Sequence, residues 1–321
     1  MLIGMRNREY RPTLPQLRAF VAIADTGHFG QAAQRLGISQ PSLSQALSTL
    51  ESGLGVQLVE RSTRRVLVTP LGRGILPYAR QVSEIVDDIV ARASGRTDEL
   101  SGPLAIGFIP TIAPYILPSF LRSIREELPD LEPRIVEEPT AHLIEALRSG
   151  SIDAAVLALP SGVSSFTETP LYEEEFHLVV PEDHELAGRD DVPLDVLGEL
   201  DLLLLDDGHC LRDQVLDLCR RVDALRDDDL GLETRAASLS TVVQCVAGGL
   251  GQTLVPASAL RVEAERPGLA TARFAGPVRP GRTVGLVHRA SSVRGDEFNR
   301  IAELVKAAFD ESIADLPGSG E

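Results

Sequence analysis

Apolar residues in the N-terminal part of the chain recur every three or four positions, which is the period of an amphipathic helix. They form three blocks: residues 17–24, which end near Gly27, residues 29–36, which Gly37 stops, and residues 43–50. A helix, a short turn with glycine and a second helix make a helix-turn-helix. The pattern therefore predicts a small helical domain of this type.

The third predicted helix has a start signal and a polar outer face. Ser39 is a suitable N-cap, and Pro41 fits the first turn of the helix. The outward positions carry short polar side chains suited to base edges and phosphates, namely Ser42, Gln45, Ser48 and Thr49. We therefore predict that this helix reads DNA.

A predicted hairpin follows, with strands at 57–61 and 66–69 and a tip at 62–65. The three arginines around this tip indicate a basic wing over the phosphate backbone. The alternative is a small helical domain whose basic loop is merely solvated. The winged interpretation predicts a DNA-binding domain over residues 13–70. Its expected DNA contacts are Ser39, Gln40, Pro41, Ser42, Gln45, Arg61, Arg64 and Arg65.

Residues 71–93 carry a narrow apolar stripe with successive spacings of 3, 4, 3 and 4, which is the a and d seam of a coiled coil. Its members are Ile75, Tyr78, Val82, Ile85 and Ile89. We predict a long linker helix that dimerises. The alternative, a helix packed on its own domain, would carry a wider stripe. Residues 94–102 are polar and contain glycine, so they predict a hinge.

In residues 103–315, short apolar runs alternate with helical patterns. Strands are expected at 104–109, 133–138, 154–158, 176–180 and 202–205, and helices at 115–127 and 141–149. Strand–helix–strand alternation predicts an α/β domain of two lobes, with parallel sheets covered by helices on both faces. Ligands in such sheets bind where strands end. Thr111 and Thr140 stand at two of these ends, where each can cap a helix or point its hydroxyl into a cleft.

The charge of the chain is unevenly distributed. The net charge is −16, yet residues 1–75 contain nine arginines and four acids, a surplus of +5 that leaves −21 for the rest. This asymmetry fits a small DNA-binding head on an acidic body. The three cysteines and the lack of a signal peptide or an apolar span indicate a cytoplasmic protein away from membranes.

Two of the three cysteines lie close together in the sequence, at Cys210 and Cys219. An acidic turn precedes Cys210, which is flanked by His209 and followed by Arg212, at the start of a predicted helix. Such a setting favours a reactive thiolate. Nine residues of intact helix span about 13 Å, whereas a disulfide needs Cα atoms within about 7 Å. The two thiols can therefore bridge only if the segment refolds, which suggests a redox sensor.

Several segments together resemble the LysR-type transcriptional regulators. The head carries the resemblance at residues 31–36, 39–44, 50–51, 54–61 and 69–72, and the body resembles the two-lobed, periplasmic-binding-protein-like effector domain of that family. Within the family, three segments resemble its hydrogen-peroxide sensors: residues 109–115, residues 207–214 with the later Cys219, and residues 282–287.

The resemblance implies a transcriptional regulator of peroxide-defence genes rather than an enzyme. Cys210 corresponds to the peroxidatic cysteine, and Cys219 to the resolving cysteine that closes a disulfide. The positions expected to hold the peroxide and its water are Thr111, Thr140, His209 and Arg282, with Asp213 orienting Arg212 or the helix start. The resemblance also implies a dimer or a tetramer on double-stranded operator DNA, resetting by a glutaredoxin or thioredoxin system, and no metal or organic cofactor.

Three other functions stay open at this point. A LysR-type regulator of a carboxylate or aromatic effector would use the two hydroxyls and Arg282, with both thiols as bystanders. A thiol peroxidase would use the same chemistry at Cys210 but leave the DNA-binding head without purpose. A metal site of His209, Cys210 and Cys219 does not match the usual zinc spacing. The third cysteine, Cys245, is expected to be a buried free thiol on an apolar helix face.

Overall fold

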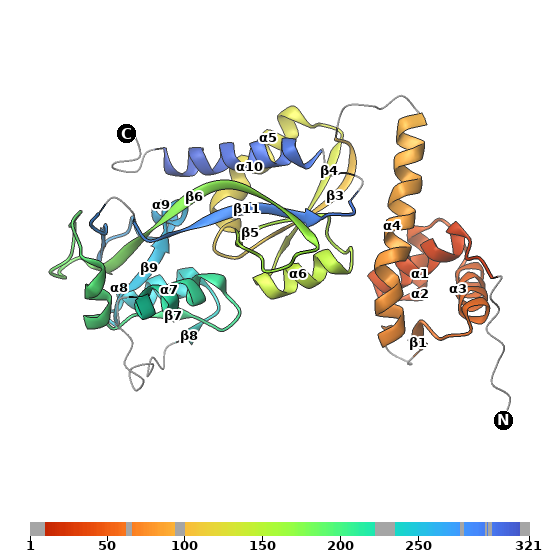
Figure 1. The fold of residues 1–321 in the computed structure, drawn as a ribbon, viewed down its shortest axis with the longest axis horizontal. Helices are drawn as coiled ribbons and strands as arrows, with labels where there is room; N and C mark the ends of the chain where they lie inside the picture. The colour runs from red at the N-terminus through yellow and green to blue at the C-terminus, as the bar shows by residue number, and fades with distance from the viewer. Residues whose placement is uncertain are drawn as a thin grey trace. The chain divides into compact units, whose positions relative to one another are not determined.

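The computed structural model describes residues 10–61, 66–93, 100–221, 235–276, 279–292, 294 and 297–314. They divide into two compact units, one built mainly from the residues before Leu100 and the other from the residues after it. Each unit is described by itself (Figure 1).

The N-terminal unit contains the three helices that the apolar period predicts, followed by a short antiparallel hairpin and a long helix. Its elements are α1 (Leu14–Thr26), α2 (Phe29–Arg35), α3 (Gln40–Leu54), β1 (Val59–Arg61), β2 (Val66–Val68) and α4 (Pro70–Ala93). The core between α1 and α3 is closed by large, fully buried side chains, including Phe20, Ile23, Leu43, Leu47 and Leu50.

Local signals in the sequence set the ends of these helices. Gly27 follows α1 with φ of 63°, a left-handed conformation that glycine adopts without steric cost. Ser39 caps α3, because its hydroxyl accepts a hydrogen bond from the backbone N–H of Ser42. The Glu51 carboxylate accepts the N–H groups of Leu58 and Val59, at 2.7 and 3.0 Å, and so joins α3 to the hairpin.

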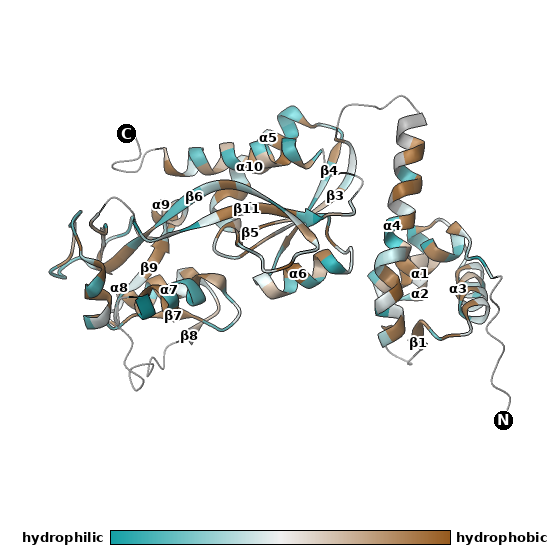
Figure 2. Ribbon diagram, in the orientation of Figure 1, coloured by the Kyte–Doolittle hydropathy of each residue, from teal (hydrophilic) through white to brown (hydrophobic). Residues whose placement is uncertain are grey.

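The predicted a and d seam of α4 divides into two parts. Around Ile75, the helix packs on α1 with Leu76 and Ala79 buried. Further along, Tyr78 is 69% exposed and Ile89 58%. Figure 2 shows apolar residues along this helix. Of the seam, Ile75 thus packs on the unit's own core, and the positions from Tyr78 onward are exposed in the chain.

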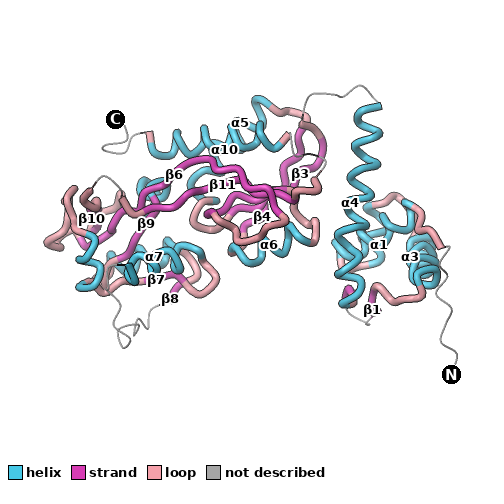
Figure 3. Tube along the Cα trace, viewed as in Figure 1, coloured by secondary structure: helices cyan, strands magenta, loops and turns pink. Residues whose placement is uncertain are grey.

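The C-terminal unit alternates strands and helices. Its first lobe contains β3 (Gly102–Phe108), α5 (Ala113–Glu127), β4 (Leu131–Glu137), α6 (Thr140–Arg148), β5 (Ala154–Leu159) and α10 (Phe298–Ile313). Its second lobe contains η1 (Leu194–Glu199), β7 (Leu204–Leu205), α7 (Cys210–Arg221), β8 (Arg235–Ala236), α8 (Leu239–Ala247), β9 (Thr253–Pro256), η2 (Ala257–Ala259), α9 (Leu260–Glu263) and β10 (Leu269–Ala272). Two long strands, β6 (Phe166–Pro181) and β11 (Gly281–Arg289), run through both lobes (Figure 3).

The strands form one mixed sheet in the order β10-β6-β11-β5-β3-β4, and β9 also pairs with β6. β3 is parallel to β4 and β5, as expected. The expectation of parallel sheets is wrong for the rest, because β11 inserts antiparallel between β5 and β6, and β9 and β10 are antiparallel to β6. The alternation of strands and helices along the chain predicts which segments form, but it does not predict that β11, near the end of the chain, inserts between β5 and β6. The predicted strand 202–205 is also shorter, since only Leu204–Leu205 forms β7.

Candidate functional site

Cys210 is the first residue of α7, and its charge is among those that raise the pKa of Arg282 on β11. A turn at Gly208, with φ of 96°, ends the acidic segment, and the helix begins at Cys210 itself. The thiol is half-buried. Free backbone N–H groups and the positive end of the helix dipole surround such a position, as the sequence predicts.

Arg282 of β11 is the cation that faces this position. Its side chain is fully buried. Its Nη1 donates to the hydroxyl of Thr111 at 2.7 Å, and its Nη2 donates to the carbonyl of the same residue at 3.0 Å. Thr111 follows β3 and caps no helix, because the residue before α5 is Ile112. The hydroxyl of Thr111 therefore serves the buried arginine.

The charge of Arg282 is balanced by Glu174, a buried carboxylate that the sequence analysis missed. Glu174 lies directly opposite Arg282 in the β6–β11 register, accepts a hydrogen bond from its Nε at 2.8 Å and forms an ion pair with its Nη2 at 2.7 Å. Ser258 donates both its backbone N–H, at 3.0 Å, and its hydroxyl to the other carboxylate oxygen. Burial opposes the charge of Arg282, but the nearby Glu174 and then Cys210 hold the pKa of the guanidinium above its usual value.

Three buried polar atoms near the start of α7 or α6 have no hydrogen-bond partner among the described residues. They are Thr140 Oγ1, His209 Nδ1 and Gln214 Oε1. Thr140 begins α6, so its unpartnered hydroxyl is not a helix cap. Buried polar atoms without partners cost stability, and they commonly mark a place where a small ligand or a water binds. Of the three residues, Gln214 was not expected, although it is four positions after Cys210 and so lies on the same helical face.

Asp213 was expected to orient either Arg212 or the helix start, and of these two only a role at the helix start is compatible with the contacts of Arg212. Arg212 pairs with Asp207, at 3.0 Å, and donates to the carbonyl of Leu205 at 3.3 Å. Asp213 is exposed in the first turn of α7. Arg212 is therefore tied to the turn that precedes the helix rather than to the helix itself.

The second cysteine of α7 has very different surroundings. Cys219 is 4% exposed and packs in the apolar core of the second lobe, and burial raises the pKa of its thiol. It lies about 13 Å along the helix from Cys210 and, at 3.6 residues per turn, on the opposite face. All three thiols are free. Cys245 is half-buried rather than buried as expected, because it lies at the edge of the apolar face of α8.

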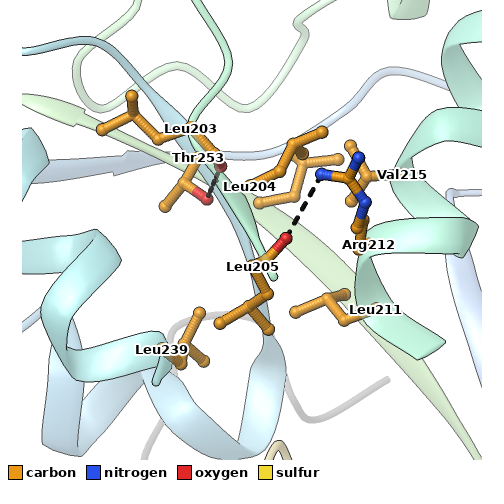
Figure 4. A pocket seen from close by; sticks show the side chains of 9 residues that line it. Leu203, Leu204, Leu205, Leu211, Arg212, Val215, Leu239 and Thr253 are labelled. Carbon is orange, nitrogen blue, oxygen red and sulfur yellow. Dashed lines mark hydrogen bonds between the residues drawn. The ribbon is translucent and has the colours of Figure 1, made fainter. Parts of the chain in front are cut away.

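A small apolar pocket lies beside α7, and Figure 4 shows its lining. Leucines line most of it, and its two polar side chains are already engaged. Arg212 donates to the Leu205 carbonyl, and Thr253 donates to the Leu203 carbonyl at 2.8 Å. The pocket therefore offers no open polar group for a ligand, unlike the site at the other side of the helix start.

The residues expected to contact DNA gather on one helix as far as the structure describes them. Ser39, Gln40, Pro41, Ser42 and Gln45 are all exposed at the start and along the outer face of α3. Arg64 and Arg65 lie outside the described residues, and so does the side chain of Arg61.

The described part of the chain contains no group of three or more His, Cys, Asp or Glu side chains placed to hold a metal ion. No helix within it has both the length and the apolar character to cross a membrane.

Comparison with known protein families assigns both units. Residues 14–73 match the model of bacterial regulatory helix-turn-helix proteins of the lysR family, and residues 97–310 match the LysR substrate binding domain.

Among curated relatives, the chain is 50% identical over 301 residues to a probable hydrogen peroxide-inducible genes activator of Mycobacterium leprae. The match covers 94% of this chain and 96% of the relative. Two solved structures are also similar. One is an H2O2-bound cysteine-to-serine mutant of OxyR from Corynebacterium glutamicum, with 55% identity, a TM-score of 0.68 and coverage of 96% and 95%. The other is a full-length cysteine-to-aspartate OxyR from Pseudomonas aeruginosa, with 34% identity, a TM-score of 0.80 and coverage of 93% and 96%.

Proposed function

This chain belongs to the LysR family of bacterial helix-turn-helix regulators, and we propose that it controls transcription of peroxide-defence genes in response to hydrogen peroxide. As a member of that family it is a transcriptional regulator rather than an enzyme. The observation that carries the proposal is Cys210 at a helix start, where its charge acts on the buried Arg282 and where the adjacent His209 and Gln214, one turn later, carry unpartnered polar atoms. The peroxide-inducible relatives agree with it.

The chemistry begins at the Cys210 thiolate. Its sulfur attacks one oxygen of hydrogen peroxide, an S–O bond forms, the O–O bond breaks, and the leaving hydroxide takes a proton to become water. Donors near the leaving oxygen favour this step, because negative charge develops there. Thr111, Thr140, His209 and Arg282 are the residues we assign to hold the peroxide and the nearby water. Asp213 is a weaker member of this set, since it is exposed.

Closure of the disulfide is the second step. The Cys219 sulfur displaces the hydroxyl of the Cys210 sulfenic acid, which leaves as water after protonation, and an S–S bond forms. Two electrons from a dithiol reductant of the glutaredoxin or thioredoxin class reset the pair. Because the two residues lie on opposite faces of α7, closure requires the helix to unwind. We propose that this refolding is the signal to DNA.

Assembly and DNA binding complete the proposal. Exposed Tyr78, Val82, Ile85 and Ile89 form a seam on α4 through which two chains associate, and two such dimers make a tetramer on double-stranded DNA. The start of α3 enters the major groove, and Arg61, Arg64 and Arg65 contact the backbone.

The three other functions fit the site less well. A carboxylate effector needs a cation that is not already neutralised, and Arg282 is paired with Glu174 inside the protein. A peroxidase has no use for the DNA-binding unit that the family match identifies. A metal at His209, Cys210 and Cys219 would require ligands from opposite faces of one helix.

The test combines stoichiometric peroxide, disulfide mapping by mass spectrometry and binding to DNA selected by the reduced protein from a random pool. We expect a Cys210–Cys219 bridge and a change in DNA binding. Cys210→Ser should abolish both, and Cys219→Ser should leave a sulfenic acid that a dione reagent traps. Cys245→Ser is the matched control and should respond as the parent does. A response that survives Cys210→Ser, or a bridge to Cys245, would overturn the proposal.

A further inference from the structure

Glu174 is placed to act on the proposed peroxide site through Arg282, although it is itself set back from Cys210 behind the guanidinium. The carboxylate is 1% exposed, and all four groups that face it are donors: Nε and Nη2 of Arg282, and the N–H and hydroxyl of Ser258. No water can replace these donors without opening the core. Both oxygens of the carboxylate are thus occupied by Arg282 and Ser258, which hold it in one position.

One N–H of the Arg282 guanidinium has no acceptor among the described residues. Five N–H groups are available in an arginine. Nε donates to Glu174, Nη2 donates to the Thr111 carbonyl, and Nη1 donates one hydrogen to the Thr111 hydroxyl; Nη2 is also 2.7 Å from the Glu174 carboxylate, as part of the ion pair. The remaining Nη1 hydrogen has no partner among the described residues. Because the Thr111 hydroxyl accepts from Arg282, its own hydrogen is also available to donate.

These contacts fix the orientation of the Arg282 guanidinium. Glu174 binds its Nε side in a charge-assisted pair, so the Nη1 end must point to Thr111 and away from β6. The proposed function assigns Arg282 and Thr111 to the peroxide that reacts with Cys210, and the charge of Cys210 is among those that hold the pKa of Arg282 above its usual value. An arginine held in this way presents its donors without reorganisation when charge develops on a nearby oxygen.

We propose that Glu174 is a positioning residue for the reaction of Cys210 with peroxide, fixing Arg282 so that its free Nη1 hydrogen and the Thr111 hydroxyl meet the leaving oxygen. The inference rests on the proposed function. It predicts that Glu174 matters only while Arg282 is present.

The experiment measures the second-order rate constant for peroxide oxidation of Cys210 across pH. The parent is the full chain with Cys219→Ser and Cys245→Ser, so that only one thiol reacts. Arg282→Ala should lower the high-pH plateau of the rate about 100-fold, as loss of one donor to a developing oxyanion commonly does. Glu174→Gln should lower it about tenfold, since an amide cannot accept all four donors. Glu174→Asp, which keeps the charge on a shorter arm, should fall between Glu174→Gln and the parent.

A double-mutant cycle separates positioning from general damage. In the Arg282→Ala background, Glu174→Gln and Glu174→Asp should each change the plateau by less than about twofold. Losses that multiply in the double variants would overturn the inference, and so would a Glu174→Gln plateau within about twofold of the parent. If Glu174→Gln does not fold, the Glu174→Asp cycle decides in the same way.

Glu263→Gln is the matched control. Glu263 is also a buried carboxylate, and it accepts from Tyr115 at 3.2 Å and from Ser240, but it does not touch Arg282. Its plateau should stay within about twofold of the parent, and an equal slowing there would overturn the inference by showing a general effect of buried carboxylates. A parent chain whose Cys210 does not react with peroxide would instead overturn the proposed function.

Discussion

The two ends of α7 hold chemically identical side chains in opposite surroundings. Cys210 begins the helix, with unpartnered polar atoms on the adjacent His209 and on Gln214 one turn later, whereas Cys219, in the last turn, is packed among leucines and valines. The first end, which we call the polar end of α7, has polar atoms without hydrogen-bond partners. The second, the apolar end, is closely packed in the core of the second lobe. One helix of 12 residues thus holds a half-buried thiol at its start and a thiol packed in the apolar core in its last turn.

The largest loss of stability is expected when one member of the Arg282–Glu174 ion pair is removed. Arg282→Ala leaves Glu174 charged in the interior with only the donors of Ser258. Loss of one partner of a buried pair typically costs about 3–5 kcal/mol, because the other charge stays buried and uncompensated. We expect a loss of this size in the free energy of unfolding, measured with urea.

The cause can be checked by removing the charge as well. Glu174→Gln combined with Arg282→Ala should be less destabilised than Arg282→Ala alone, because no lone charge remains in the core. A double variant whose loss equals the sum of the two single losses would contradict this account, since it would show that the two side chains stabilise the protein independently.

A smaller effect distinguishes the two threonines of the polar end. The hydroxyl of Thr140 is buried without a partner, so Thr140→Val should raise the free energy of unfolding by about 1 kcal/mol. The hydroxyl of Thr111 accepts from Arg282, so Thr111→Val should lower the free energy by about 2 kcal/mol. Both variants should react more slowly with peroxide. Urea unfolding and the Cys210 oxidation rate are the measurements.

The comparison of the two threonines depends on whether Thr140→Val raises or lowers the free energy of unfolding. A destabilised Thr140→Val would mean that its hydroxyl already has a partner in the protein, and the polar end would then lack one of its open positions. A stabilised variant that still reacts at the parent rate would show that the hydroxyl is unsatisfied but takes no part in the reaction.

Sequence reasoning succeeded where the signals are local. The apolar period and the caps at Gly27 and Ser39 predicted helices that the structure confirms, because the residues that start and stop each helix are neighbours along the chain. The α/β class of the body followed from its alternating segments in the same way. A helix start at Cys210 was also predictable from the turn residues before it.

Contacts between residues far apart in the sequence could not be predicted from it. Glu174 meets Arg282 across 108 positions, and only the insertion of β11 beside β6 brings the two into register. Its flanking residues, Glu173 and Glu175, are acidic too, so no feature of the sequence marks the buried one. The unpartnered atoms of Thr140 and His209 were equally hidden, since the lack of a partner depends on everything packed around them.

The apolar end predicts the smallest effect, a pH dependence of stability. Burial raises the pKa of Cys219 above its usual value, so the folded state keeps the proton where the unfolded chain has lost it. Below the unfolded pKa of about 8.5 the contribution is complete, and it is lost as pH rises through the higher folded value. Urea unfolding should therefore show the parent losing more stability than Cys219→Ala above pH 9. The comparison between the two chains cancels tyrosines and lysine, which titrate in both. Parallel pH profiles would mean that burial does not hold the proton on Cys219 and would contradict this account of the apolar end.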